Sequence, residues 1–216
     1  MKIGAIIIDS KYPDRQKYVN NIEAFFKNTE VSVIKVDGIF TDKVLYDARF
    51  DDNRTLTSGQ IGCSLAHVNA LKTAIDMEFD YTFIFEDDVD VCVKNYYELK
   101  SWLDNLGEYD LCLVTNIGSF EGIGHDGRTH KNTRIRDYMY VTCPFGTQCY
   151  YANKNIIKLL YETQLNYINN NKIHIADGLH IHCEKNKNEF LKIITPQNSY
   201  QFFQTGNTVS IREALV

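Results

Sequence analysis

The chain has 216 residues, 44% hydrophobic and 24% charged, which is typical of a globular protein with a well-formed core. Its net charge of −5 excludes the basic surface of a general nucleic-acid binder, and only three prolines exclude long Pro-rich linkers. No stretch reaches the ~18 apolar residues of a membrane span. We therefore expect a single domain with no transmembrane segment.

The cysteines and the N-terminus predict a location for the protein. The six cysteines include no Cys-x-x-Cys pair, and most lie within apolar runs, as free thiols of a reducing compartment do. The apolar run near the N-terminus is too short for a signal peptide, and Asp9 interrupts it. These features favour a cytoplasmic protein.

The first part of the chain alternates strand and helix patterns. Strands are predicted over 3–8 and 31–36, with an amphipathic helix to about residue 27 between them, which makes a βαβ unit. Residues 39–57 have no clear period and are predicted to be a loop. Ser58 is the predicted cap of the next helix. The apolar stripe of this helix consists of Ile61, Leu65, Val68, Leu71 and Ile75. His67 lies outside this stripe and is therefore predicted to be off the buried face.

The stretch 80–91 is the one around which we expect the fold to be organised. Tyr81 to Phe85 is an unbroken run of apolar and β-branched residues, typical of a strand buried on both faces. It ends in a cluster of acids, namely Glu86, Asp87, Asp88 and, one residue further, Asp90. Crowded carboxylates repel one another, and a bound Mg²⁺ or Mn²⁺ would relieve that cost at the carboxyl end of a strand. The alternative is a solvated acidic turn.

The second part of the chain contains more short segments. A helix capped by Asn95 and a strand over 110–114 precede a Gly-rich segment, 115–137, predicted to be a long functional or mobile loop. Its basic residues would meet a diphosphate or an acceptor, or simply form a solvated face. Further strands are predicted over 138–142, 147–152 and 190–194, with a helix capped by Asn153 and an irregular tail after residue 196.

Two blocks resemble glycosyltransferase family 25, which holds lipooligosaccharide galactosyltransferases and collagen hydroxylysine galactosyltransferases. They are Gly59-Gln-Ile-Gly-Cys-Ser-Leu-Ala-His67 and, about twenty residues later, Phe85-Glu-Asp-Asp-Val89. In this sequence Gln60 replaces the glutamate and Ala66 the serine that are usual in the family. Minor matches follow in the same order at Asp14-Arg15, Val36-Asp37-Gly38, Gly146-Thr147-Gln-Cys-Tyr150, Ala176-Asp177 and Pro196-Gln197.

The resemblance implies an α/β fold of the GT-A type, a Rossmann-like nucleotide-diphospho-sugar transferase with a mixed, mostly parallel sheet flanked by helices. It implies one domain over 1–216, with a nucleotide-sugar and metal-binding half at 1–114 and an acceptor-side half with a C-terminal tail at 115–216. The implied activity is inverting transfer of a hexose, with galactose favoured, from a UDP-sugar to a hydroxyl of a glycan or protein acceptor. The implied cofactor is Mn²⁺ or Mg²⁺.

The resemblance also implies roles for individual residues. Asp88 is the expected direct metal ligand with Glu86, and His180 and His182 are candidate ligands from later in the chain. Asp177 is the first choice for the base that deprotonates the acceptor, although it also suits the metal. The expected donor-binding residues are Ile8, Asp9, Arg15, Gly59, Gln60, His67 and Asp87, and the acceptor-side residues are Gly146, Thr147 and Gln148.

Two other classes of function deserve comparison. Asp88-Val-Asp90-Val matches the motif of haloacid-dehalogenase-type phosphatases, but that motif normally follows the first strand, and the downstream Gly-Asp-x-x-x-Asp is absent. A catalytically degenerate protein that only binds a sugar nucleotide or glycan is suggested by Gln60. The intact acidic triplet favours the transferase over the degenerate binding protein.

Overall fold

The computed structural model describes residues 1–50, 52–115, 118–119, 121–123, 128–135, 138–142, 144–146, 148–186, 189–197 and 202–205. Its centre is an eight-stranded sheet in the order β10-β11-β17-β6-β13-β4-β1-β2. The strands are β1 (Ile3–Asp9), β2 (Val31–Asp37), β4 (Tyr81–Glu86), β6 (Leu111–Leu113), β10 (Thr133–Ile135), β11 (Tyr138–Val141), β13 (Cys149–Asn153) and β17 (Ile193–Pro196).

The sheet is mixed, as predicted, but it is not mostly parallel, because three of its pairings are parallel and four are antiparallel among the described strands. Strand β1 pairs in parallel with β2 and β4, and β17 pairs in parallel with β6. Strand β13 runs antiparallel between β4 and β6, and β11 is antiparallel to β10 and β17. The carboxyl ends of β1, β2, β4 and β6 therefore meet along one edge of the sheet.

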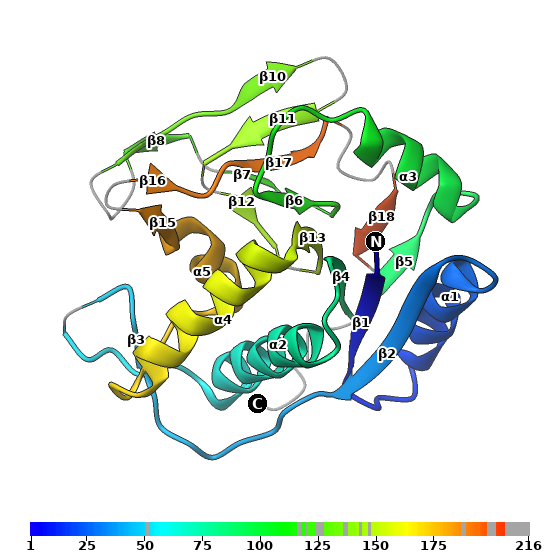
Figure 1. Ribbon diagram of the computed structural model, residues 1–216. Coiled ribbons are helices and arrows are strands. Elements are labelled where there is room, and N and C mark those ends of the chain that lie inside the picture. The colour runs from blue at the N-terminus through cyan, green and yellow to red at the C-terminus, as the bar shows by residue number, and fades with distance from the viewer. Residues whose placement is uncertain are drawn as a thin grey trace.

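Helices cover both faces of this sheet (Figure 1). On one face α2, α4 and α5 share a core cluster with Ile6 and Ile84, and on the other α1 and α3 pack against Ile7 and Phe85. The helices are α1 (Gln16–Phe26), α2 (Ser58–Asp76), α3 (Tyr96–Asp104), α4 (Lys154–Ile168) and α5 (Ala176–His182). No helix in the described part of the chain has both the length and the apolar character needed to span a membrane.

The central strands have the environment that their sequences predict. Ile6, Ile7, Ile84 and Phe85 are fully buried, and successive residues alternate between the two core clusters. Strand β4 lies between β1 and β13, so its run of apolar side chains is covered on both faces. The register pairs Ile8 with Glu86, which places the segment after β1 beside the acidic end of β4.

Helix α2 differs from the prediction in its cap and its buried face. Thr57, not Ser58, is the N-cap, and it forms a capping box with Gln60. His67 is buried, whereas Leu65, Val68 and Ile75 are only half-buried. Helix α2 packs on both the sheet and α4, so more than one stripe is covered, and small residues allow close approach at Ala66, Ala70 and Ala74.

Short strand pairs add structure where loops or an irregular tail were predicted. Within or beside 39–57 and 115–137 lie β3 (Tyr46–Asp47) with β14 (Lys172–Ile173), β7 (Gly118–Ser119) with β12 (Pro144–Phe145), and β8 (Gly122–Ile123) with β9 (Thr129–His130). Near the C-terminus, β15 (Glu184–Asn186) pairs with β16 (Glu189–Phe190), and β18 (Phe203–Thr205) pairs with β5 (Val89–Val91). Strand β18 contradicts the predicted irregular tail, because Phe202 and Phe203 are anchored in the core.

Candidate active site

Asp87 ties the end of β4 to the segment that follows β1. Its Oδ2 accepts hydrogen bonds from the backbone N of Ser10 at 2.7 Å and from the Ser10 hydroxyl. Its Oδ1 accepts from Nη1 of Arg15 at 2.6 Å. Both carboxylate oxygens are thus engaged within the protein. Asp87 and Arg15, two predicted donor-binding residues, are brought together here as a buried ion pair.

Asp88 is the acid with unused bonding capacity. Its Oδ2 lies 3.5 Å from Nη1 of Arg15, while its Oδ1 is buried with no hydrogen-bond partner among the described residues. Burial, and then the charge of Glu86, raise the pKa of Asp88 to about 7, and the nearby Arg15 opposes that rise. An orphaned carboxylate oxygen beside other carboxylates fits a hard divalent cation such as Mn²⁺ or Mg²⁺.

Glu86 faces the other side of the sheet, toward α2. Its Oε1 lies 3.3 Å from Nε2 of His67, and Nδ1 of His67 lies 3.2 Å from the hydroxyl of Tyr150 on β13. Cys63, one turn before His67 on α2, completes a group whose ligand atoms all lie within 4.8 Å of one another. Cys63 is not among the site residues predicted from the sequence. The signal was present, because Cys63 and His67 are four residues apart and share a helix face.

The other predicted donor-binding residues lie at the same edge, with their side chains in internal roles. Ile8 belongs to the core. Asp9 is buried, and although burial would raise its pKa, hydrogen bonds from Lys11 and Gln16 lower it below the usual value. Gly59 lies in the first turn of α2, where Oε1 of Gln60 accepts from the backbone N of Thr57 at 3.0 Å.

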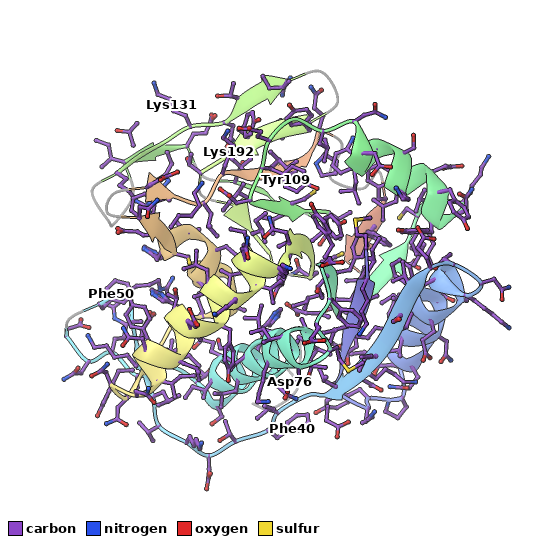
Figure 2. All side chains as sticks on the ribbon, viewed as in Figure 1. Phe40, Phe50, Asp76, Tyr109, Lys131 and Lys192 are labelled. Carbon is purple, nitrogen blue, oxygen red and sulfur yellow. The ribbon has the colours of Figure 1, made fainter. Side chains whose placement is uncertain are left out.

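Gly62, in the same block, has a packing role. A Cβ atom built there would lie 2.2 Å from the backbone oxygen of Ile39, so only glycine lets the segment after β2 cross α2 this closely. That segment also presents Phe40, which is 62% exposed and lies edge-on to Tyr12 at 6.1 Å between ring centroids (Figure 2). An aromatic pair is therefore available near the ends of β1 and β2.

The predicted acceptor-side residues lie at the start of β13. The backbone N of Glu86 donates to the carbonyl of Gln148 at 2.8 Å, so Gln148 directly adjoins the acidic end of β4. Its side-chain Oε1 is buried without a partner among the described residues. Gly146 adopts φ 92°, a conformation that favours glycine. Thr147 lies outside the described residues.

Helix α5 carries the three remaining candidates and separates them. His180 packs edge-on against Tyr150 at 4.6 Å, and burial, then the charge of His67, lower its pKa to about 3. His182 instead stacks on His174 at 5.2 Å. The structure therefore does not bring the two imidazoles together as a ligand pair. Asp177 lies in the first turn of α5, and its side chain falls outside the described part of the structure.

Comparison with solved structures supports the fold. A glycosyltransferase involved in glycosylation of the major capsid of PBCV-1 superposes with a TM-score of 0.50 at 9% identity, covering 89% of this chain and 81% of that one. A Drosophila galactosyltransferase 7 mutant in complex with manganese, UDP-Gal and xylobiose gives a TM-score of 0.44 at 11% identity, covering 99% and 74%. At 9% identity the first likeness concerns the fold alone, and the second, with a TM-score below 0.5, adds no argument.

Comparison of sequences identifies the family. Human procollagen galactosyltransferase 2 is 37% identical over 59 residues, a segment that spans 27% of this chain and only 9% of the human protein. Residues 16–177 match glycosyltransferase family 25, described as an LPS biosynthesis protein. This second match covers most of the chain, including both resembling blocks and the acidic end of β4. The chain therefore belongs to glycosyltransferase family 25.

Proposed function

We propose that this protein is an inverting, metal-dependent glycosyltransferase that moves a hexose, with galactose favoured, from a UDP-sugar to a hydroxyl of a glycan or protein acceptor. One observation carries the proposal. In a chain of glycosyltransferase family 25, Asp88 has a buried carboxylate oxygen that finds no hydrogen-bond partner in the described part of the chain, at the edge where parallel strands end. That edge is where open α/β sheets bind nucleotides.

Asp88 would hold Mn²⁺ or Mg²⁺, and Glu86, whose charge reaches Asp88 but whose side chain contacts His67, would add negative charge near the ion. The carboxylate oxygens suit such ions, and the raised pKa of Asp88 shows the cost of leaving it uncompensated. A bound divalent cation supplies stabilisation of the negative charge that develops on the leaving diphosphate. The Arg15 side chain is buried. We therefore assign it the role of holding Asp87 and Asp88 in position rather than binding the donor directly.

In this proposal the two halves of the chain supply different parts of the site at the same edge of the sheet. Residues 1–114 supply Asp88, Glu86 and the Tyr12–Phe40 pair, which offers aromatic surface for the base of the donor. Residues 115–216 supply helix α5 and Gln148, whose amide oxygen has no partner within the described ranges and suits a sugar hydroxyl. We retain Asp177 as the base, supported by its place one turn before His180, which packs on the Tyr150 beside His67.

Thermal unfolding against a panel of nucleotide sugars, with and without Mn²⁺, tests this proposal. One UDP-sugar should raise the midpoint in the presence of Mn²⁺, because a ligand that binds only the native state stabilises it by mass action. The shift should vanish in Asp88→Asn and persist in Asp76→Asn, the same change on the exposed part of α2 (Figure 2). No shift with any nucleotide sugar would contradict the proposal. A shift without turnover on any acceptor would favour the degenerate binding protein.

A further inference from the structure

We propose that a thiophilic divalent cation, Zn²⁺ under cellular conditions, binds between α2 and β4 through Cys63, His67 and Glu86. The site shares Glu86 with the acidic strand end, and its other two ligands come from α2. This metal-site proposal requires no assumption about the sugar that is transferred. Its tests measure metal binding, so their outcome does not depend on the proposed transferase activity.

The three ligands converge from two rigid elements. Cys63 and His67 lie one turn apart on α2, and Glu86 ends β4. Their ligand atoms all lie within 4.8 Å of one another, and Nε2 of His67 is 3.3 Å from Oε1 of Glu86. Zinc bonds of about 2.0–2.3 Å bring ligand atoms to roughly 3–4 Å from each other. Small side-chain adjustments are therefore enough to close the site around an ion.

Tyr150 prepares His67 for this role. Its hydroxyl lies 3.2 Å from Nδ1 of His67, and the two rings are stacked at 5.8 Å. Burial, and then the charge of Glu86, raise the pKa of Tyr150 well above its usual value, so the phenol stays neutral. When that hydroxyl accepts from Nδ1–H, the Nε2 lone pair faces Cys63 and Glu86. Metal-binding histidines typically have such an outer partner.

The chemistry of the ligands selects the metal. A thiolate and an imidazole favour Zn²⁺ over Mg²⁺ or Mn²⁺, whereas the carboxylates near Asp88 favour the hard ions. Three protein ligands leave one tetrahedral position for water. An ion bound here would hold Glu86 against α2 and so fix one of the acids beside the donor-side cation.

Cobalt substitution is the first test. Co²⁺ added to the wild-type protein should produce a thiolate-to-cobalt charge-transfer band and be displaced by Zn²⁺. Cys63→Ser should abolish that band, while Cys92→Ser, the same change at an exposed cysteine outside the group, should keep it. Tyr150→Phe should weaken binding roughly 10- to 100-fold. Asp88→Asn should bind Co²⁺ as the wild type does.

Two results would overturn the proposal: a wild-type spectrum without a thiolate band, or a band that is lost in Asp88→Asn and retained in Cys63→Ser. A second measurement avoids substitutions altogether. Alkylation of the wild-type protein, resolved by mass spectrometry of individual cysteine peptides, should slow at Cys63 when Zn²⁺ is added and remain unchanged at Cys92. Equal alkylation of Cys63 with and without Zn²⁺ would also overturn it.

Discussion

The acids at the end of β4 lie in two different neighbourhoods. On the arginine side, Asp87 and Asp88 meet the buried guanidinium of Arg15, which stays charged at every physiological pH. On the imidazole side, Glu86 meets His67 and Cys63, whose ring nitrogen and sulfur are potential metal ligands. The negative charges at the end of this strand are therefore offset in two ways. The guanidinium of Arg15 is a permanent internal cation, whereas Cys63 and His67 are groups that we propose bind a metal ion.

Removing the fixed cation should have the largest effect. Arg15→Met keeps the apolar stem but leaves the buried charge of Asp87 without its cation, so we expect the free energy of unfolding to fall by about 3–5 kcal/mol. Urea unfolding measures the change. Lys35→Met breaks the exposed pair with Glu23 and should cost under about 1 kcal/mol. Similar losses for the two variants would show that burial does not distinguish the arginine side.

Asp88→Asn should abolish most of the transferase rate while leaving the fold intact. Loss of one group that stabilises developing charge typically lowers kcat by roughly 10²–10³-fold. The rate is measured with the UDP-sugar identified by thermal unfolding, and Asp76→Asn should retain the wild-type value. A variant at position 88 that keeps the wild-type rate would remove Asp88 from the chemistry.

The same carboxyl group should make stability depend on pH. Its folded-state pKa of about 7 exceeds the ordinary 3.8, so the folded protein holds the proton more tightly than the unfolded chain. This contribution is present below pH ~4, declines as the pH rises to about 7 and is absent above that. As the pH rises from ~4 to ~8, the free energy of unfolding of Asp88→Asn should therefore increase by about 2–4 kcal/mol relative to that of the wild type. Parallel urea-unfolding stabilities across that range would contradict the assignment.

The smallest effect is expected at Gln60, which begins the helix that carries the imidazole side. Gln60→Ala removes the capping box and should cost about 1 kcal/mol, while Gln60→Glu keeps an acceptor oxygen and should change stability by less than about 0.5 kcal/mol. The KM for the donor distinguishes this structural role from the predicted contact with the donor. An unchanged KM in Gln60→Ala assigns the residue to the cap alone.

The sequence predicts the scaffold of the site better than its contacts. Strands β1 and β4 are predicted correctly because unbroken apolar runs leave few alternatives, and Asn95 and Asn153 cap their helices as expected. The pairing of Arg15 with Asp87 depends on the register of β1 against β4, which no local pattern reveals. Local periodicity also misplaces His67, because α2 is covered on more than one side.

The late histidines show the same limit. His180 and His182 are only two residues apart, yet positions with that spacing on a short helix face different neighbours, and only packing decides which. Strand β18 was missed because its apolar signal is only two phenylalanines within a polar segment. Its pairing depends on β5, far earlier in the chain. Contacts made across long sequence separations are therefore the part of the site that sequence patterns leave undetermined.

The pairing of β18 with β5 has a consequence for the order in which parts of the protein fold during synthesis. Thr205 on β18 pairs with Val89, the residue directly after Asp88, and Phe203 packs edge-on against Phe85 at 5.3 Å. During translation the N-terminal βαβ unit leaves the ribosome early and can begin to fold. The acidic turn gains its supporting strand only after residue 205 has emerged. The nascent chain therefore completes this edge of the sheet only after β18 has emerged, more than a hundred residues after β4.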